Sequence, residues 1–118
     1  MNRDEFERVV AAALDGLPGE VAALLENIAV VVEDEPSDDD LISVGLDPES
    51  ETLFGLYQGV AMPERGATYG NVLPDRIAIY RRPLIEACHD RDELVREIRD
   101  TVVHEVGHYF GLGEEDLP

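Results

Sequence analysis

Two histidines four residues apart, with a glutamate directly after the first, lie in the stretch TVVHEVGHYFGLGEEDLP, residues 101–118. On a helix this spacing places His104 and His108 one above the other. Two imidazoles in that arrangement reach one ion, about 2 Å from each ring nitrogen, without bending the helix. In such an H-E-x-x-H sequence the carboxylate of Glu105 is not a ligand but accepts a proton from water. The stretch therefore predicts a zinc site with Glu105 as a general base.

A third protein ligand is expected after the helix, because catalytic zinc is held by three side chains and keeps one position open. Gly111 permits a sharp turn of the chain, and Glu114 follows it three residues later. The sequence predicts Glu114 as this ligand, while Glu115 and Asp116 are close enough to compete for the role. An H-E-x-x-H sequence alone also occurs by chance in many proteins. The prediction depends on the histidines, the glycine and the carboxylate occurring together.

The helix that carries the histidines is predicted over residues 91–111, with Asp90 as its N-cap and Glu93 as the capping-box partner. Apolar residues at helical spacing form the face that packs against the core. The two histidines lie outside this face, on the side of the helix that carries Glu97 and Thr101. The apolar face consists of Leu94, Val95, Ile98, Val102, Val106 and Tyr109.

The elements that must position this helix are visible as changes of pattern along the chain. An apolar stripe at helical spacing predicts a helix over residues 3–16. Runs rich in β-branched residues predict strands, and the strand over residues 76–82 alternates Ile77 and Ile79 with Ala78 and Tyr80. The other predicted strands are residues 27–34 and 52–60, and short helices are predicted after Ser37 and from Pro83.

The composition predicts one domain over residues 1–118, because 44% apolar content is typical of a globular chain of this length. No apolar run approaches the ~20 residues of a membrane span. The charged start MNRDEFERVV lacks the apolar segment of a signal peptide. The single cysteine, Cys88, cannot form an internal disulfide. We therefore expect a cytoplasmic protein.

The formal net charge of -18 narrows the classes of partner. Such a surface repels nucleic acid and anionic membranes, so neither is expected as a partner, and a basic partner fits better. Six of the eight residues from 33 to 40 are acidic. They lack the spaced Asp and Asn residues and the central glycine of an EF-hand, so a solvated acidic loop is predicted there.

The stretches PDRIAIYRRPL, residues 74–84, and VVHEVGHYFGLGEEDL, residues 102–117, give the chain a family resemblance. It resembles the small bacterial zincin-like metallopeptidases, whose extended motif is H-E-x-x-H-x-x-G-x-x-H/D. Members of that family carry a histidine after the second ligand and an aspartate as the third. This sequence has Tyr109 and Glu114 at those two places, and Asp116 is the alternative third ligand.

The resemblance implies a minimal zincin-like α+β domain, in which a short twisted mixed sheet packs on a backing helix and a C-terminal active-site helix. It implies that His104, His108 and Glu114 hold Zn²⁺ and that Glu105 is the catalytic base. The substrate would be a peptide or protein that pairs with residues 76–82 or 52–60 as an extra strand. Independently of the resemblance, Tyr80 and Tyr69 are candidates to stabilise the oxyanion.

A second hypothesis is a catalytically weak or silent binding module of the same fold. Its metal would be structural, and its acidic surface would dock a basic protein partner.

Overall fold

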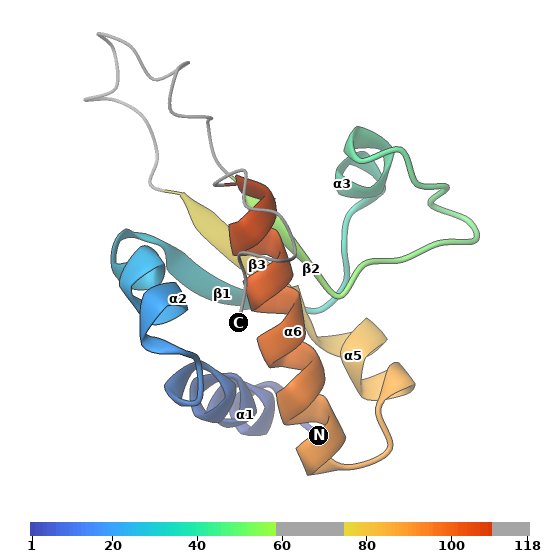
Figure 1. Ribbon diagram of the computed structural model, residues 1–118. Helices are drawn as coiled ribbons and strands as arrows, with labels where there is room; N and C mark the ends of the chain where they lie inside the picture. Colours follow the sequence, from blue (N-terminus) through green and yellow to red (C-terminus); the bar gives the residue numbers. More distant parts are fainter. Residues whose placement is uncertain (59–74, 110–118) are drawn as a thin grey trace, which may run out of the picture.

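The computed structural model describes residues 1–58 and 75–109, and it has an α+β fold with a three-stranded mixed sheet and a long C-terminal helix (Figure 1). The helices are α1 (Arg3–Asp15), α2 (Gly19–Leu24), α3 (Asp38–Ser43), α5 (Arg81–Ala87) and α6 (Arg91–Tyr109), with a 3₁₀ turn, η1 (Leu25–Asn27), after α2. The strands are β1 (Ala29–Glu33), β2 (Gly55–Gln58) and β3 (Arg76–Tyr80). In this part of the chain no helix has the length and apolar character needed to cross a bilayer.

The sheet has the order β1-β3-β2, so β3 is its central strand. β1 runs parallel to β3, with Val30 opposite Ile77, and β2 runs antiparallel to it, with Tyr57 opposite the same residue. A peptide can add to a sheet only at an outer strand. The expectation that residues 76–82 accept such a peptide is therefore wrong for this sheet, and β2, within 52–60, is the alternative that remains.

The predicted strand over residues 76–82 ends two residues early, at Tyr80, because α5 begins at Arg81. Tyr80 has extended backbone angles and occupies the N-cap position of α5. Pro83 is therefore the third residue of α5 and not its first. Proline is tolerated there, because N–H groups in the first turn of a helix have no helical acceptor. The other predicted helices and strands are present, while the predicted ends at residues 60 and 111 lie outside the described residues.

The helices α1 and α6 pack against each other on one face of the sheet. The hydrophobic core lies between these two helices and the sheet. The apolar stripe predicted for residues 3–16 is confirmed, since Phe6 and Ala13 of α1 are fully buried. The apolar face of α6 is confirmed for its described part by the fully buried Ile98 and Val102, while the side chain of Tyr109 lies outside the described part. The buried members of this core are Phe6, Val9, Val10, Ala13, Val32, Ile77, Ile79, Leu84, Leu94, Ile98, Val102 and Val106.

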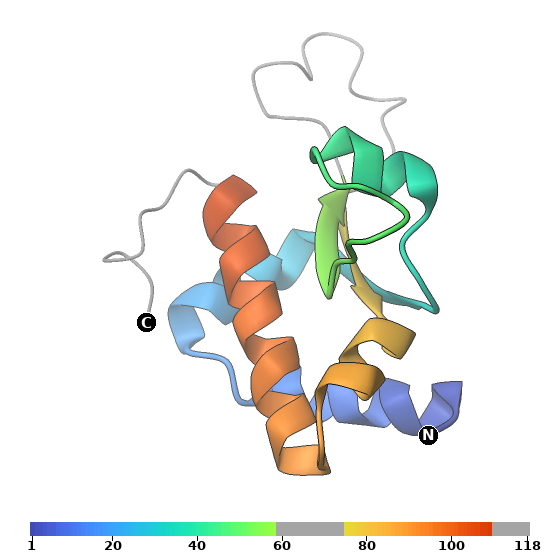
Figure 2. The same ribbon diagram turned by 90° about the vertical axis from the view of Figure 1, so that its right-hand side faces the viewer.

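The opposite face of the sheet is also covered, because α3 lies on the side away from α6 (Figure 2). Ala78 and Tyr80 are fully buried, like Ile77 and Ile79. The two alternating sets of side chains predicted for this strand are therefore both buried, because a central strand covered on both faces buries each set. The hydroxyl of Tyr80 and the carboxylate of Asp40 on α3 are 3.3 Å apart.

The acidic stretch from 33 to 40 is more ordered than the solvated loop that its composition predicts. Ser37 caps α3 as predicted, since its Oγ accepts a hydrogen bond from the backbone N–H of Asp40 at 3.0 Å. The first turn of α3 contains three aspartates, which the partial positive charge of a helix N-terminus stabilises. Asp34 pairs with Arg81 at 3.0 Å, and the hydrogen bond from Arg81 lowers the pKa of the Asp34 carboxyl.

The helix α6 is fixed at its start and in its middle. Asp90 caps it as predicted, accepting a hydrogen bond from the backbone N–H of Glu93 at 2.8 Å. Further along, Arg99 donates from Nε to the carbonyl of Ala13 at 3.4 Å, near the end of α1. A Cβ at Gly16 would lie 2.4 Å from the guanidinium of Arg99, so glycine makes room for this contact between the two helices.

Candidate active site

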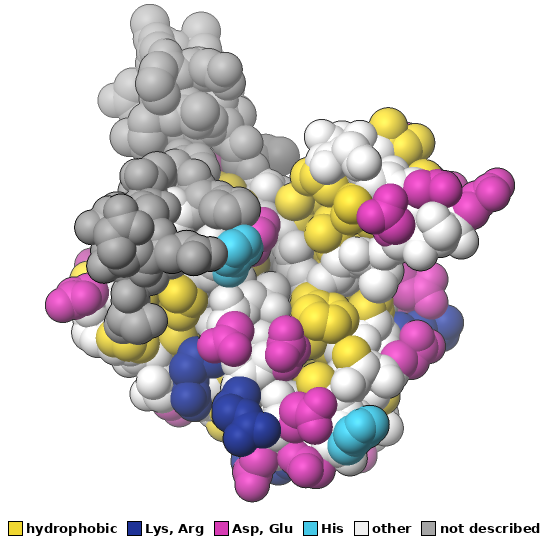
Figure 3. Space-filling model, turned by 45° about the vertical axis from the view of Figure 1, so that its right-hand side comes forward, with side chains coloured by type: hydrophobic (Ala, Val, Ile, Leu, Met, Phe, Trp, Pro, Cys, Tyr) yellow, Lys and Arg dark blue, Asp and Glu magenta, His cyan; other side chains and the backbone are white. Residues whose placement is uncertain are grey.

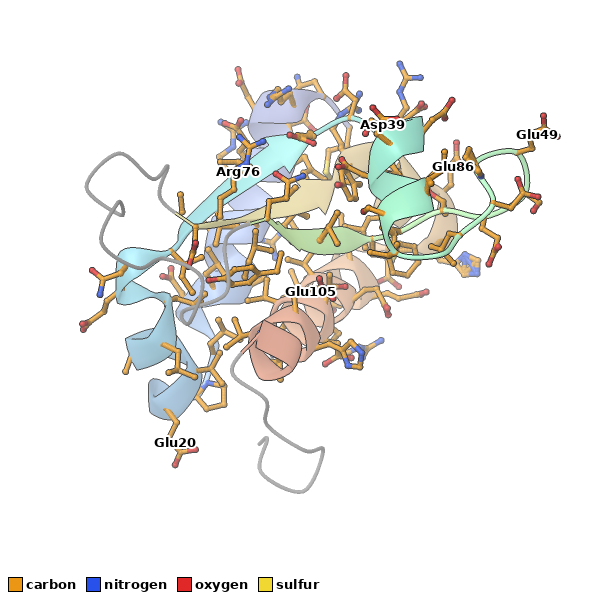
Figure 4. The ribbon with its side chains drawn as sticks, turned by 90° about the horizontal axis from the view of Figure 1, so that it is seen from above. Glu20, Asp39, Glu49, Arg76, Glu86 and Glu105 are labelled. Atoms are coloured by element: carbon orange, nitrogen blue, oxygen red, sulfur yellow. The ribbon has the colours of Figure 1, made fainter. Side chains whose placement is uncertain are left out.

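Glu105 lies on α6 beside the outer strand β2 (Figure 4). Its Oε1 accepts a hydrogen bond from the backbone N–H of Tyr57 at 2.8 Å, and the side chain is half-buried. The N–H of Tyr80 donates to the carbonyl of Phe54. In the antiparallel register, the backbone N–H and C=O groups of every second β2 residue therefore point toward β3. Those of Tyr57 point away from β3. The outward N–H of an edge strand thus holds one oxygen of this carboxylate.

A glycine brings β2 close enough to α6 for this hydrogen bond. A Cβ at Gly55 would lie 2.6 Å from Cγ2 of Thr101 and 3.0 Å from the carbonyl oxygen of Ala78. Any larger residue at this position must push the strand away from the helix or distort the sheet. The sequence shows the glycine as an interruption of a strand pattern, which is typical of a close backbone approach.

The side chain of Tyr57 fixes the same strand at a second point. Its hydroxyl donates to Oδ2 of Asp75 at 2.9 Å, and Asp75 is only 8% exposed. The backbone carbonyl of Asp75 accepts a hydrogen bond from the N–H of Ala29, at the start of β1. Asp75 therefore connects all three strands at one end of the sheet. Sequence reasoning missed both Tyr57 and Asp75, because neither is part of a recognisable motif.

His104 is exposed and lines a hollow of about 340 Å³ together with Glu105. One wall of this hollow comes from the approach to β2, and the other comes from α6. Figure 3 shows a hollow in this face of the molecule, with hydrophobic side chains on one side and a histidine and acidic side chains on the other. The wall residues are Leu53, Phe54 and Gly55 on the strand side, and Glu97, Asp100, Thr101, His104 and Glu105 on the helix side.

The remaining predicted site residues are only partly within the described structure. The backbone of α6 continues through His108, one turn beyond His104, as the predicted pair requires. The side chain of His108 lies outside the described part, and so do Glu114 and its alternatives Glu115 and Asp116. Among the described residues, no group of three side chains is suited to hold a metal ion.

The donors that are described fit zinc chemistry. The exposed imidazole of His104 lies beside a carboxylate that a backbone N–H already orients. Neutral imidazole nitrogen is among the preferred zinc ligands. The helix that carries it continues to a second histidine one turn away. The arrangement can therefore present two nitrogen ligands along one side of α6, with a base between them in the sequence.

The other residues that the sequence singled out lie elsewhere. Cys88 is half-buried, and this burial, more than the neighbouring acids, raises the pKa of its thiol, which reduces its capacity to bind metal as a thiolate. His89 is exposed. Tyr80 points toward Asp40, and burial in the sheet raises the pKa of its phenol. Tyr80 is therefore unsuited to the oxyanion role, and Tyr69 lies outside the described residues.

Comparison with solved structures defines the class of fold. The chain is similar to a conserved hypothetical protein from Thermo thermophilus, with a TM-score of 0.61 and 21% sequence identity. The match covers 93% of this chain and 94% of that protein. At this level of identity the match concerns the fold alone.

Comparison with the profiles of protein families shows to which family the chain belongs. The profile of the zincin-like metallopeptidase family matches residues 25–118, and the chain belongs to that family. The resemblance read from the sequence is thereby confirmed, and a zincin family implies zinc and a peptide substrate. No significantly similar curated protein was found.

Proposed function

We propose that this protein is a zinc-dependent metallopeptidase in which His104, His108 and Glu114 hold the metal and Glu105 is the catalytic base. When bound, zinc supplies a Lewis acid that polarises a peptide carbonyl and lowers the pKa of water. The observation that carries the proposal is the position of Glu105, half-buried beside the exposed His104 and tied to the edge strand. Family membership supports the same conclusion.

Glu105 moves the proton in this proposal. Its Oε1 is occupied by the N–H of Tyr57 at 2.8 Å, so the carboxylate is held in one orientation. Oε2 accepts a proton from the water that attacks the peptide carbonyl, and it returns that proton to the nitrogen of the leaving amine. Because the carboxylate is oriented before the substrate arrives, little side-chain freedom has to be lost during the reaction.

The outer strand β2 supplies the binding surface for the peptide backbone. Gly55 directs its backbone N–H and carbonyl away from β3, as the register requires, whereas the outward N–H of Tyr57 is held by Glu105. An extended peptide pairs with such an edge through main-chain hydrogen bonds. This pairing would place the peptide across the hollow and beside Glu105, since Gly55 and Glu105 both line it.

The test is cleavage of a mixed peptide library by the zinc-loaded chain and by its Glu105→Gln variant. Glutamine still accepts the hydrogen bond from Tyr57 through its amide oxygen, but it takes no proton. We expect the rate to fall by about 10²- to 10⁴-fold, the range typical of a lost general base, while bound zinc is unchanged. Glu86→Gln, at an exposed position on α5, is the matched control and should cleave like the wild type. Unchanged cleavage by Glu105→Gln would contradict the mechanism.

The strongly acidic surface favours a second candidate, a binding module for a basic protein partner. The net charge of -18 attracts basic proteins whether or not the site is catalytic. In that case the wild-type chain would hold zinc and cleave no peptide of the library, and removing zinc would lower stability.

A further inference from the structure

The hollow beside Glu105 has a chemical character of its own. Its strand side presents the apolar side chains of Leu53 and Phe54. Its helix side presents two carboxylates, Glu97 and Asp100, on the same face of α6 as His104. The spacing of positions 97, 100, 101 and 104 is that of one stripe along a helix.

The two carboxylates are available to a ligand. Glu97 is half-buried and Asp100 is exposed, and neither forms an ion pair with another described residue. No lysine or arginine is among the described residues that line the hollow. Thr101, one turn after Glu97, donates its hydroxyl to the carbonyl of Glu97 at 2.8 Å and turns its methyl toward Gly55. The described residues on the helix side therefore present carboxylates and one imidazole.

We propose that this hollow is a side-chain pocket of the peptide site, and that it takes a lysine or arginine from a residue next to the cleaved bond. The inference rests on the proposed function, because it assigns the specificity of that same site. Long basic side chains lay their methylene stems along apolar surface and keep the charged head among polar groups. Leu53 and Phe54 supply the apolar surface, and Glu97 and Asp100 supply the counter-charges.

The dimensions of α6 are consistent with this assignment. A helix rises about 1.5 Å per residue, so Asp100 and Glu97 lie about 6 and 10 Å along the axis from His104. A side chain that starts beside Glu105 must therefore be long for its charge to reach the acids. A short or acidic side chain would leave the carboxylates without a partner or be repelled by them. General attraction by the negative surface would favour basic residues at every peptide position equally, whereas a pocket favours them at one.

The experiment measures binding and cleavage separately, on zinc-loaded full-length chain. The probes are fluorescent peptides of alanine and glycine in which each position in turn carries lysine, arginine or norleucine, an uncharged residue with a similar stem. Binding is measured by anisotropy, and cleavage of the same peptides is measured by mass spectrometry. The pocket variant is Glu97→Gln/Asp100→Asn. The control variant, Glu20→Gln/Glu26→Gln, loses the same charge at exposed positions outside the hollow, and Figure 4 shows Glu20 far from Glu105.

We expect one position at which lysine or arginine binds about tenfold more tightly than norleucine, as two partly exposed ion pairs provide. The pocket variant should lose this preference and the control should keep it, with unchanged melting temperatures for both. Equal preference at all positions, or preference that survives in the pocket variant, would overturn the inference. Position-specific binding without cleavage leaves the pocket standing and refutes the peptidase. Cleavage without a basic preference refutes the pocket and leaves the peptidase standing.

Discussion

The two outer strands of the sheet, β1 and β2, each have one outward backbone group held by a charged side chain, and the two side chains have opposite charge. At β1 the guanidinium of Arg3 donates to the outward carbonyl of Val32. At β2 the carboxylate of Glu105 accepts from the outward N–H of Tyr57. Both contacts occupy a backbone group that would otherwise be open to pairing with another strand. A cation therefore holds one outward backbone group at the β1 edge, and an anion holds one at the β2 edge, where the backbone groups of Gly55 are still directed outward.

The surroundings of the two contacts differ as well. Beside β1 lies a hollow of about 460 Å³ whose one acid, Glu7, pairs with Arg3 at 3.3 Å. Beside β2 the hollow contains an exposed histidine and carboxylates without a described ion-pair partner. Holding a backbone group at an edge requires only a side chain of the right charge, whereas hydrolysis requires a base and metal ligands. Among the described residues, only the β2 edge has a proposed base and a proposed metal ligand, Glu105 and His104, so the proposed catalysis belongs to that edge.

Gly55→Ala gives the largest expected change, because it pushes β2 away from α6. The added Cβ meets Cγ2 of Thr101 at 2.6 Å, and overpacking of this kind costs about 1–3 kcal/mol of unfolding free energy. Urea denaturation measures the loss. Adding Thr101→Ser removes the methyl group and should restore part of the stability.

Gly19→Ala on α2 is the control for Gly55→Ala, since no atom lies within 4 Å of the added carbon. It should be neutral or stabilise by up to about 1 kcal/mol. Equal effects of the two alanine substitutions would show that β2 does not depend on a close approach to α6.

Glu105→Ala gives the next largest change in stability, because it leaves the half-buried N–H of Tyr57 without its acceptor. We expect a loss of about 1–2 kcal/mol, and nearly none for Glu105→Gln, which keeps an acceptor oxygen. The same denaturation experiment compares the two variants. If both cost the same, the hydrogen bond to Tyr57 does not contribute to holding this edge.

Arg3→Met gives the smallest change, since Arg3 is exposed and lies at the edge away from the proposed base, Glu105. We expect a loss of at most about 1 kcal/mol, with zinc content and peptide cleavage unchanged. Parallel assays of zinc and cleavage in Arg3→Met and Glu105→Ala make the comparison directly. A loss of zinc or of cleavage in Arg3→Met would remove the distinction between the two edges.

The parts of the fold that the sequence predicted depend on local pattern. The helix α6 follows from its apolar spacing and from the Asp90 cap, and α3 follows from Ser37. The family resemblance followed from short motifs and is confirmed. The metal ligands His104, His108 and Glu114 remain predictions, since the described residues do not include a complete set.

The parts that the sequence did not predict depend on long-range contacts. The partner of Glu105 is a backbone N–H 48 residues away, and a backbone group has no signature in the sequence. The burial of Ala78 and Tyr80 follows from β1 and β2 flanking β3 and from α3 covering its second face, which no pattern within β3 itself indicates. Gly55 was visible as a glycine, but Thr101, the neighbour that requires it, was not.

The most direct test of the account is the zinc content of the purified wild-type chain and of two histidine variants, measured by elemental mass spectrometry after equilibration with zinc. We predict one zinc per wild-type chain and per His89→Ala chain, since His89 is exposed and lies outside the hollow. His104→Ala should hold almost none, because zinc loses one of its proposed three ligands. A wild-type chain without zinc, or a His104→Ala chain that keeps it, would contradict the account.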